Sequence, residues 1–220
     1  HAAALLEGGA GALLGLDRDP QALVIARKRL APFWERAHTA HTSYLEMADE
    51  AARLGWSAVD AILLDLGVSS MQFDTAERGF SFRYDAPLDM RFDPSGDTPT
   101  AAELIDMLDA DELAHIFFRY GEERHARRIA RAIIAARPIT TAGALAQIVA
   151  GAVPRQRDSH IHPATRVFQA LRIAVNDELG ALERVLPLAI ELLATGGRLA
   201  VISFHSLEDR IVKDALRLAS

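Results

Sequence analysis

Two short apolar runs, each ending at an aspartate, constrain the fold of this chain more than any other feature. Residues 12–16 (ALLGL) lead into Asp17, and residues 59–64 (VDAILL) lead into Asp65. Apolar residues at helical spacing lie between them, most clearly over residues 20–30. Short buried strands that alternate with helices are typical of a parallel sheet. This part of the chain therefore predicts a doubly wound α/β sheet with an acid at the carboxyl end of two strands.

The alternation of strands and helices then stops. Residues 67–98 are rich in Gly, Pro, Asp and Ser and predict a long loop, which in a compact domain is usually functional or disordered. Residues 101–151 have a helical pattern, and a longer helix over residues 163–193 is expected to kink or break near Pro187. A further buried strand over residues 198–204 precedes a final helix.

These patterns predict a sheet domain that is interrupted by a helical insertion. Residues 1–98, including the long loop, form the first part of the sheet domain. Residues 99–160 form the insertion, and residues 161–220 complete the sheet domain. Such an arrangement places a second, all-helical region beside an α/β core.

The charge of the chain is concentrated in and around the insertion. The net charge is −6, yet residues 113–172 contain ten arginines and three acids, a local charge of +7 (10 − 3) that leaves −13 elsewhere. The arginines are Arg119, Arg124, Arg127, Arg128, Arg131, Arg137, Arg155, Arg157, Arg166 and Arg172. Because a planar guanidinium suits phosphate and stacking on bases, one interpretation is a nucleic-acid partner. The alternative is a solvated helix face on which Glu122 and Glu123 pair with Arg127 and Arg128.

Composition excludes several classes of protein. Without cysteine, the chain has no disulfide, thiolate metal site or cysteine nucleophile, as expected of a cytoplasmic protein. No apolar stretch approaches the roughly 18 residues of a membrane span. The eight histidines, including His160 and His162, do not match a known metal motif, so no metal is expected. Neither G-x-S-x-G nor G-x-x-x-x-G-K-[ST] is present.

The two strand-end aspartates are candidate ligand-binding residues, because open α/β sheets bind ligands outside the carboxyl ends of their strands. Asp17 is placed to accept hydrogen bonds from both ribose hydroxyls of an adenosine; the alternative is a helix cap, which Asp19 would provide better. Asp65 would suit a sulfonium, an adenine amine or the exocyclic amine of a base, and its alternative is a strand-end cap. Dehydrogenases and methyltransferases share an acid such as Asp17, so this residue does not distinguish them.

Seven stretches together carry a closer resemblance. They are residues 15–20 (GLDRDP), 63–70 (LLDLGVSS), 76–82 (AERGFSF), 87–91 (PLDMR), 120–124 (YGEER), 162–166 (HPATR) with Phe168-Gln169, and 202–210 (ISFHSLEDR). In these stretches the chain resembles the RsmH (MraW) family of bacterial 16S rRNA cytosine-N4 methyltransferases. The AERGFSF and SFHSLEDR stretches are the most specific.

The resemblance implies a class I methyltransferase, Rossmann-like fold, with S-adenosyl-L-methionine as donor and a cytidine in the decoding region of 16S rRNA, in the small ribosomal subunit, as acceptor. The family's cofactor contacts correspond to His1, Asp17, Tyr44, Asp65 and Gln72. His1 would end a Gly-Gly-His segment whose glycines, with the strand before them, are absent from this sequence, and family members continue beyond Ser220. The resemblance therefore implies a core truncated at both ends. The oligomeric state stays open, with a homodimer as one alternative.

The chemistry of cytosine suggests roles for further residues. Its N4 amine is a poor nucleophile because the lone pair is delocalised, so acceptors on its N–H groups would raise its reactivity. We expect Asp65 to be catalytic in this way. Residues expected to bind the substrate are Ser203, Phe204, His205, Ser206, Arg127 and Arg128. The aromatic residues Phe80, Phe82 and Tyr84 of the long loop either contact a flipped base as part of a lid or pack the loop onto the domain.

Two other functions remain open from the sequence. A nicotinamide-dependent oxidoreductase or epimerase would also use Asp17 on a ribose, and it should bind NADH. A non-catalytic RNA-binding module would keep the basic insertion and lack the donor site. Calorimetry with S-adenosylhomocysteine separates these two from a methyltransferase.

Overall fold

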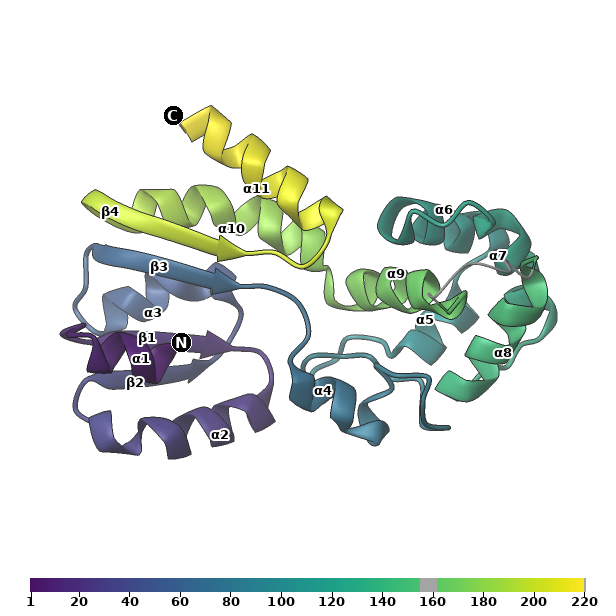
Figure 1. Ribbon diagram of the computed structural model, residues 1–220, viewed down its shortest axis with the longest axis horizontal. Coiled ribbons are helices and arrows are strands. Elements are labelled where there is room, and N and C mark those ends of the chain that lie inside the picture. Colours follow the sequence, from purple (N-terminus) through teal and green to yellow (C-terminus); the bar gives the residue numbers. More distant parts are fainter. Residues whose placement is uncertain (155–161, 220) are drawn as a thin grey trace. The chain divides into compact units, whose positions relative to one another are not determined.

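A computed structural model describes residues 1–154 and 162–219 of the chain (Figure 1). The chain divides into two compact units, a sheet unit (His1–Leu66 and Leu179–Ser220) and a helical unit (Gly67–Glu178). Three residues of the predicted basic region lie outside the described residues: Arg155, Arg157 and Asp158. The same holds for His160, one of the histidines considered as metal ligands. Within the described part, no helix is long and apolar enough to span a membrane.

The described part of the sheet unit contains four strands that form two parallel pairs. They are β1 (Leu13–Asp17), β2 (Ala37–His41), β3 (Val59–Asp65) and β4 (Leu193–Ile202). Strand β1 pairs with β2 and β3 pairs with β4, and all four arrows point the same way in Figure 1. The strands predicted over residues 12–16 and 59–64 are confirmed as β1 and β3, and all four strands are parallel. The strand predicted over residues 198–204 is found as β4, but it begins earlier, at Leu193, and ends at Ile202.

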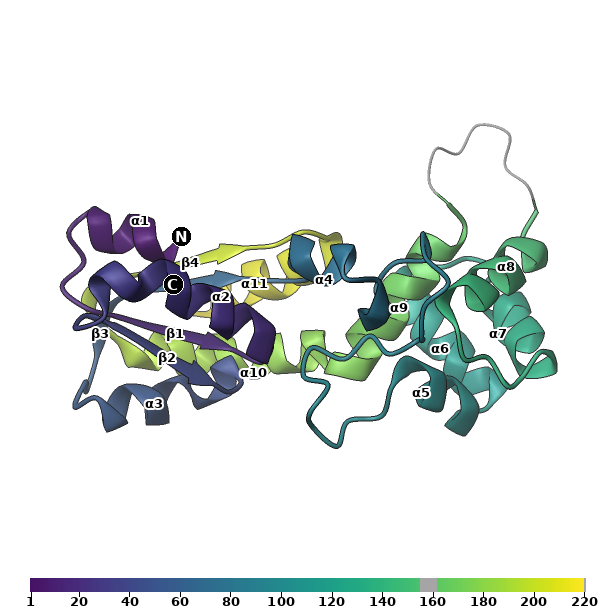
Figure 2. The ribbon, with the colours of Figure 1, turned by 90° about the horizontal axis from the view of Figure 1, so that it is seen from below.

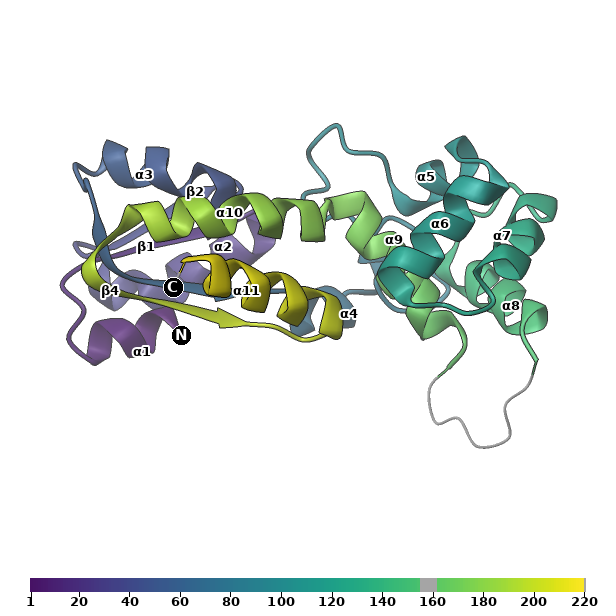
Figure 3. The same cartoon turned by 90° about the horizontal axis from the view of Figure 1, so that it is seen from above.

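Helices of the sheet unit lie on both sides of these strands. They are α1 (Ala2–Glu7), α2 (Pro20–Leu30), α3 (Met47–Arg53), α10 (Glu178–Leu192) and α11 (Ser206–Ala219), with short 3-10 turns η1 (Ala31–Phe33) and η2 (Tyr44–Glu46). Figures 2 and 3 show α1 on one side of the strands and α3 and α10 on the other. Helix α2 begins where the sequence predicts, because the Asp19 side chain accepts a hydrogen bond from the Gln21 amide.

The predicted long helix over residues 163–193 consists of two helices. Helix α9 (Ala164–Asn176) ends at Asp177, whose left-handed backbone (φ 51°) stops the helical hydrogen-bond pattern. Helix α10 continues through Pro187, so of the two predicted alternatives, a kink or a break, the break is not found. The burial of Val185, Leu186 and Ala189 around the proline outweighs the loss of one backbone hydrogen bond.

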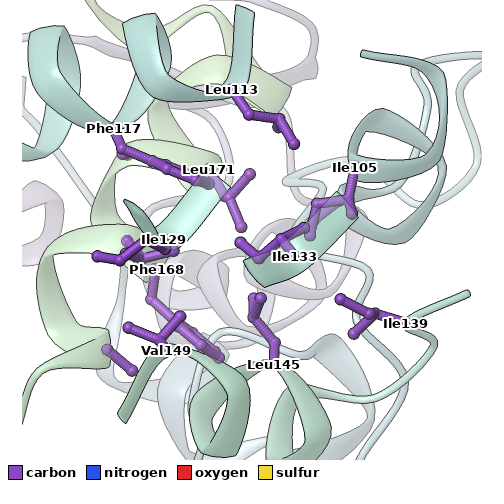
Figure 4. Packing of buried hydrophobic residues seen from close by; sticks show 14 of the residues in the cluster. Ile105, Leu113, Phe117, Ile129, Ile133, Ile139, Leu145, Val149, Phe168 and Leu171 are labelled. Carbon is purple, nitrogen blue, oxygen red and sulfur yellow. The ribbon is translucent and has the colours of Figure 1, made fainter. Parts of the chain in front are cut away.

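The helical unit packs its helices around a closed apolar core. Its elements are α4 (Ser70–Asp74), η3 (Ala76–Arg78), α5 (Ala101–Met107), α6 (Ala110–Gly121), α7 (Ala126–Ala135), α8 (Ala142–Ala152) and α9. Side chains from the helices meet in this core, as Figure 4 shows for Ile105, Leu113, Phe117, Ile129, Ile133, Leu145, Val149, Phe168 and Leu171. Capping boxes at Ser69, Thr100 and Asp109 fix the starts of α4, α5 and α6.

The boundaries of the two units differ from the predicted domain boundaries. Residues 67–98 and 162–178 belong to the helical unit, although the sequence analysis assigns all of them to the sheet domain. The physical reason is burial: Phe80 and Leu88 of the predicted loop, and Leu171 of α9, are buried in the same apolar cluster as the insertion helices.

The predicted long loop is held in place by buried polar side chains. The Arg78 guanidinium is buried and donates hydrogen bonds to the carbonyls of Arg91 and Phe92, each at 2.9 Å. The Asn176 side chain accepts from the Phe92 amide at 2.7 Å and donates to the Met90 carbonyl at 2.8 Å. The first part of the predicted loop forms α4 and η3. Residues 79–98 are ordered without a helix or strand, because these backbone groups have hydrogen-bond partners.

Candidate functional site

The carboxyl ends of the four strands lie along one edge of the sheet unit, and both predicted aspartates are there. Asp17 lies opposite His41 in the register of β1 and β2, and Asp65 lies opposite Ile202 in that of β3 and β4. Because the strands point the same way (Figure 1), their last residues share an edge. A common edge is the arrangement that one ligand bound by both carboxylates requires.

The Asp17 carboxylate has a defined orientation. Its Oδ1 accepts a hydrogen bond from the Asp19 amide at 2.8 Å, while the residue remains exposed to solvent on one side. Partial burial of the carboxyl raises its pKa, since desolvation penalises the charged form; the Asp19 amide and the neighbouring His41 oppose this rise. Asp19, rather than Asp17, caps α2, so the capping alternative for Asp17 does not hold.

Asp65 lies beside the first residue of the chain. The His1 Nε2 is 3.2 Å from Asp65 Oδ2, and both side chains are about half exposed. An exposed pair of this kind contributes little to stability, at most about 1 kcal/mol. The structure thus brings together His1 and Asp65, two of the predicted cofactor contacts, at the end of β3.

The other two predicted cofactor contacts lie in different units. Tyr44 begins η2 just after β2 and packs against the apolar cluster of the sheet unit. Gln72 belongs to the helical unit, where it is buried and its Oε1 accepts a hydrogen bond from the Ser69 amide at 2.9 Å. The structure therefore assigns Gln72 a capping role at the start of α4.

The loop after β4 and the first turn of α11 carry four predicted substrate-binding residues and a buried acid that the sequence analysis did not single out. Phe204 is 68% exposed, whereas the side chain of Glu208 is 2% exposed beneath the loop. The Glu208 Oε2 accepts from the Phe204 amide at 2.8 Å, and its Oε1 is 3.3 Å from His205 Nε2. Glu208 thus holds the segment from Ser203 to Ser206 in place. An acid in the first turn of the following helix was the available sequence signal.

The predicted RNA-binding residues Arg127 and Arg128 lie in the first turn of α7 in the helical unit, and both are exposed. Within residues 1–154 and 162–219 neither forms an ion pair. Glu123 instead is buried and accepts a hydrogen bond from the His125 amide. The alternative of a helix face neutralised by intrahelical pairs is therefore not found here.

The three aromatic residues of the predicted loop divide between packing and exposure. Phe80 is 5% exposed, and its ring stacks on Phe92 at 5.9 Å between centroids. Phe82 contacts the rings of Phe168 and His162. Tyr84 remains 49% exposed. Packing of the loop is thus the role found for Phe80 and Phe82.

The described residues contain no group of three or more His, Cys, Asp or Glu side chains that could hold a metal ion. What the geometry does offer is a parallel α/β unit with two carboxylates at the ends of its strands. This combination is typical of proteins that bind a nucleoside-containing ligand.

Comparison with known proteins identifies the family. The sequence model of the MraW methylase family matches residues 1–220. Ribosomal RNA small subunit methyltransferase H of Geobacter sulfurreducens is 56% identical over 99% of this chain and 71% of its own length. Proteins of the same name from Nitratidesulfovibrio vulgaris and Gloeobacter violaceus are 54% and 52% identical over 99% of this chain, and over 62% and 67% of their own lengths.

The chain therefore belongs to the MraW methylase family. It spans 62% of the length of the relative from Nitratidesulfovibrio vulgaris. The resemblance seen in the sequence motifs is confirmed, and the parallel strands agree with the expected fold.

Proposed function

We propose that this chain is the core of an rRNA methyltransferase that uses S-adenosyl-L-methionine to methylate the N4 amine of a cytidine in the decoding region of 16S rRNA. Family membership and the names of the relatives support methylation of small-subunit rRNA. The observation that carries the proposal is the position of Asp17 and Asp65 at the carboxyl ends of parallel strands of one unit.

The residues of this edge fit the proposed methyl donor. The Asp17 carboxylate, oriented by the Asp19 amide, suits the two hydroxyls of a ribose. Asp65, with His1 beside it, provides a negative group for the positively charged or amine-bearing part of the donor. Tyr44 adds an apolar ring next to β2. When bound, S-adenosyl-L-methionine supplies an electrophilic methyl group.

The proposed catalytic role of this chain is to orient and activate the acceptor amine. The Asp65 carboxylate accepts a hydrogen bond from an N4–H group, which increases electron density on the nitrogen and stabilises the positive charge that develops there. The segment from Ser203 to Ser206, held by Glu208, lies after the neighbouring strand β4 and contacts the cytidine. Such positioning lowers the entropic cost of the reaction.

Arg127 and Arg128 bind the phosphate backbone of the RNA in this proposal. Their guanidinium groups are exposed and without ion-pair partners in the described residues, so a phosphate can approach them without breaking an existing pair. A ribosomal substrate also implies a cytoplasmic protein.

Calorimetry with S-adenosylhomocysteine tests the donor site. We expect the chain to bind this product analogue and not NADH, and Asp17→Ala to weaken binding at least about tenfold, since it removes hydrogen bonds to a charged acceptor. Asp49→Ala, which removes an exposed carboxylate from α3, should leave the affinity unchanged. Binding of NADH in place of S-adenosylhomocysteine would contradict the proposal.

A methyl-transfer assay on small-subunit rRNA tests the catalytic residue. At saturating donor, Asp65→Asn should lower turnover about 100-fold, the effect of losing one preorganised electrostatic contact to the reacting group. Asp60→Asn is the matched control, because Asp60 is an exposed carboxylate of the same strand. Near-normal turnover of the Asp65 variant would remove this residue from the mechanism.

A further inference from the structure

The corner between α6 and α7 forms an open cavity of about 730 Å³. The proposed function involves only two of its lining residues, Arg127 and Arg128. Its functional lining consists of His115, Phe118, Arg124, His125, Arg127 and Arg128. All six belong to the helical unit. We call this feature the corner cavity.

The turn that shapes the corner cavity is firmly built. Gly121 packs so closely on α9 that an added Cβ would lie 2.5 Å from the Arg166 carbonyl oxygen. The Arg166 guanidinium donates to the Glu122 carbonyl at 3.2 Å, and the buried Glu123 carboxylate accepts from the His125 amide at 2.8 Å. These contacts fix the direction in which α7 leaves the turn, so the lining side chains start from a rigid backbone.

The lining of the corner cavity is predominantly basic. Arg124, Arg127 and Arg128 are exposed, and they form no ion pair in the described parts of the chain. A single acid, Asp111, also lines the cavity, so three guanidinium groups face one carboxylate. Guanidinium groups that are not already paired bind phosphate in a two-point, charge-assisted geometry.

An aromatic ring completes the lining. Phe118 is 68% exposed, whereas its neighbour Phe117 is fully buried in the core. Phe118 and His115 are three residues apart on α6, and this spacing places both on the helix face that lines the cavity. An exposed ring next to several arginines is the combination with which proteins bind unpaired bases and their phosphates.

We propose that the corner cavity binds a single-stranded segment of RNA, with phosphate oxygens on Arg124, Arg127 and Arg128 and one base stacked on Phe118. This site deepens the proposed RNA substrate and rests on it. An acidic peptide would pair with the arginines but would gain nothing comparable from an exposed phenyl ring. The ring therefore favours a nucleotide over a carboxylate-bearing partner.

Fluorescence anisotropy with a labelled single-stranded RNA of about ten nucleotides tests the site on the whole chain. Phe118→Ala should weaken binding about fivefold or more, the effect of losing one stacked base. Phe118→Leu should weaken it similarly, because leucine keeps the apolar volume and lacks the ring. The matched control is Phe73→Ala, since Phe73 is an exposed phenylalanine of α4 that does not line the cavity.

The arginines predict a second readout, the salt dependence of binding. Each of Arg127→Glu and Arg128→Glu should reduce the slope of log K against log salt concentration by about 0.7, the value for one phosphate contact on a single strand. Arg131→Glu is the control, because Arg131 is an exposed arginine of α7 outside the cavity lining. Circular dichroism of each variant checks that the helices are retained.

The outcomes separate this site from the proposed methyl transfer. If the unaltered chain binds no RNA, or if cavity variants and controls bind RNA equally, the corner cavity is not an RNA site. Equal competition by poly-glutamate, with no effect of Phe118→Ala, would assign the cavity to an acidic protein segment and also overturn the proposal. Loss of RNA affinity in the cavity variants, in a chain that does not bind S-adenosylhomocysteine, would support the cavity and contradict the proposed donor site.

Discussion

The sheet unit and the helical unit are similar in length but differ in how completely they bury their apolar residues. The helical unit has a continuous core to which all its longer helices contribute (Figure 4). The buried cluster of the sheet unit consists of Met47, Leu64, Leu66, Leu182, Val185, Leu186 and Ala189. Strand β3 keeps exposed residues in its first half. Since burial of apolar surface is the main stabilising contribution, the helical unit should be the more stable of the two.

This difference matches the division of proposed roles. The carboxylates proposed to bind the donor lie at exposed strand ends of the less buried unit, where desolvation of Asp17 works against stability. The corner cavity lies on the outside of the better packed unit, on a turn fixed by α9. Catalytic sites commonly lower the stability of the region that contains them, as proposed for the sheet unit. Binding residues are commonly presented by a rigid scaffold, as proposed for the helical unit.

Two spectroscopic probes distinguish the units. Both tryptophans of the chain, Trp34 and Trp56, belong to the sheet unit, so tryptophan fluorescence reports on its unfolding. Far-ultraviolet circular dichroism reports on the helices of both units. Comparing the two signals in denaturant therefore measures how far the stabilities of the units differ.

The largest effect is expected for Gly79→Ala in the helical unit. Gly79 has a left-handed backbone (φ 69°), and an added Cβ would lie 2.3 Å from the Pro87 carbonyl oxygen. Strain and overlap together should lower stability by about 3 kcal/mol or more, measured by circular dichroism. Gly55→Ala is the control in the sheet unit: its φ is 78° but nothing lies within 4 Å, so a loss of only about 1 kcal/mol is expected. Equal losses of stability in the two variants would mean that the close packing of residues 79–89 does not contribute to the stability of the helical unit.

The next largest effect is expected for Glu208→Ala in the sheet unit. This substitution removes the acceptor of the Phe204 amide and the partner of His205, so tryptophan fluorescence should show a loss of about 2 kcal/mol. Glu183→Ala, an exposed acid of α10, should have no effect on stability. If both variants unfolded like the unaltered chain, the loop after β4 would not depend on Glu208.

A smaller, pH-dependent effect is expected for Asp89→Asn. Burial by itself would raise the pKa of Asp89, but hydrogen bonds from Arg91 outweigh burial and lower it. A lowered pKa stabilises the folded state above the unfolded value of about 3.8, and this contribution is lost as the pH falls further through the folded value. At neutral pH the variant should lose about 1–2 kcal/mol by circular dichroism, and the difference should vanish in acid. A pH-independent difference would exclude the Arg91 pair as its cause.

Sequence patterns predict the sheet unit better than the helical unit. Residues 20–30 form α2 as expected, because an aspartate cap and a following proline define the start locally. The end of α9 at Asp177 was not predicted, because Asp177 is a weaker stop signal in the sequence than Pro187, although the boundary between the two units falls beside it. The ordered conformation of residues 76–92 depends on Asn176, more than eighty positions away, which no local pattern reveals.

The candidate site shows the same limit. Asp17 and Asp65 could be found because an acid after an apolar run is a local signal, and parallel strands bring such ends to one edge. Glu208 acts through a contact with the backbone of Phe204 that only the folded loop creates. Phe118 could not be singled out by residue type, because the neighbouring Phe117 has the same side chain and is buried.

The smallest effect, and the one of opposite sign, is expected for Asp17→Asn. Burial raises the pKa of Asp17, so the folded state favours the protonated form, and ionisation above that pKa costs stability. Asparagine keeps an acceptor for the Asp19 amide and has no charge to desolvate. The variant should therefore unfold at a slightly higher denaturant concentration at neutral pH, by tryptophan fluorescence, and match the unaltered chain below about pH 3.8. The same variant should bind S-adenosylhomocysteine more weakly, since the ribose loses a charged acceptor. If the variant were more stable and bound S-adenosylhomocysteine with unchanged affinity, the carboxylate of Asp17 would have no role in ligand binding. Ligand binding by Asp17 would then not explain why the sheet unit is less buried than the helical unit.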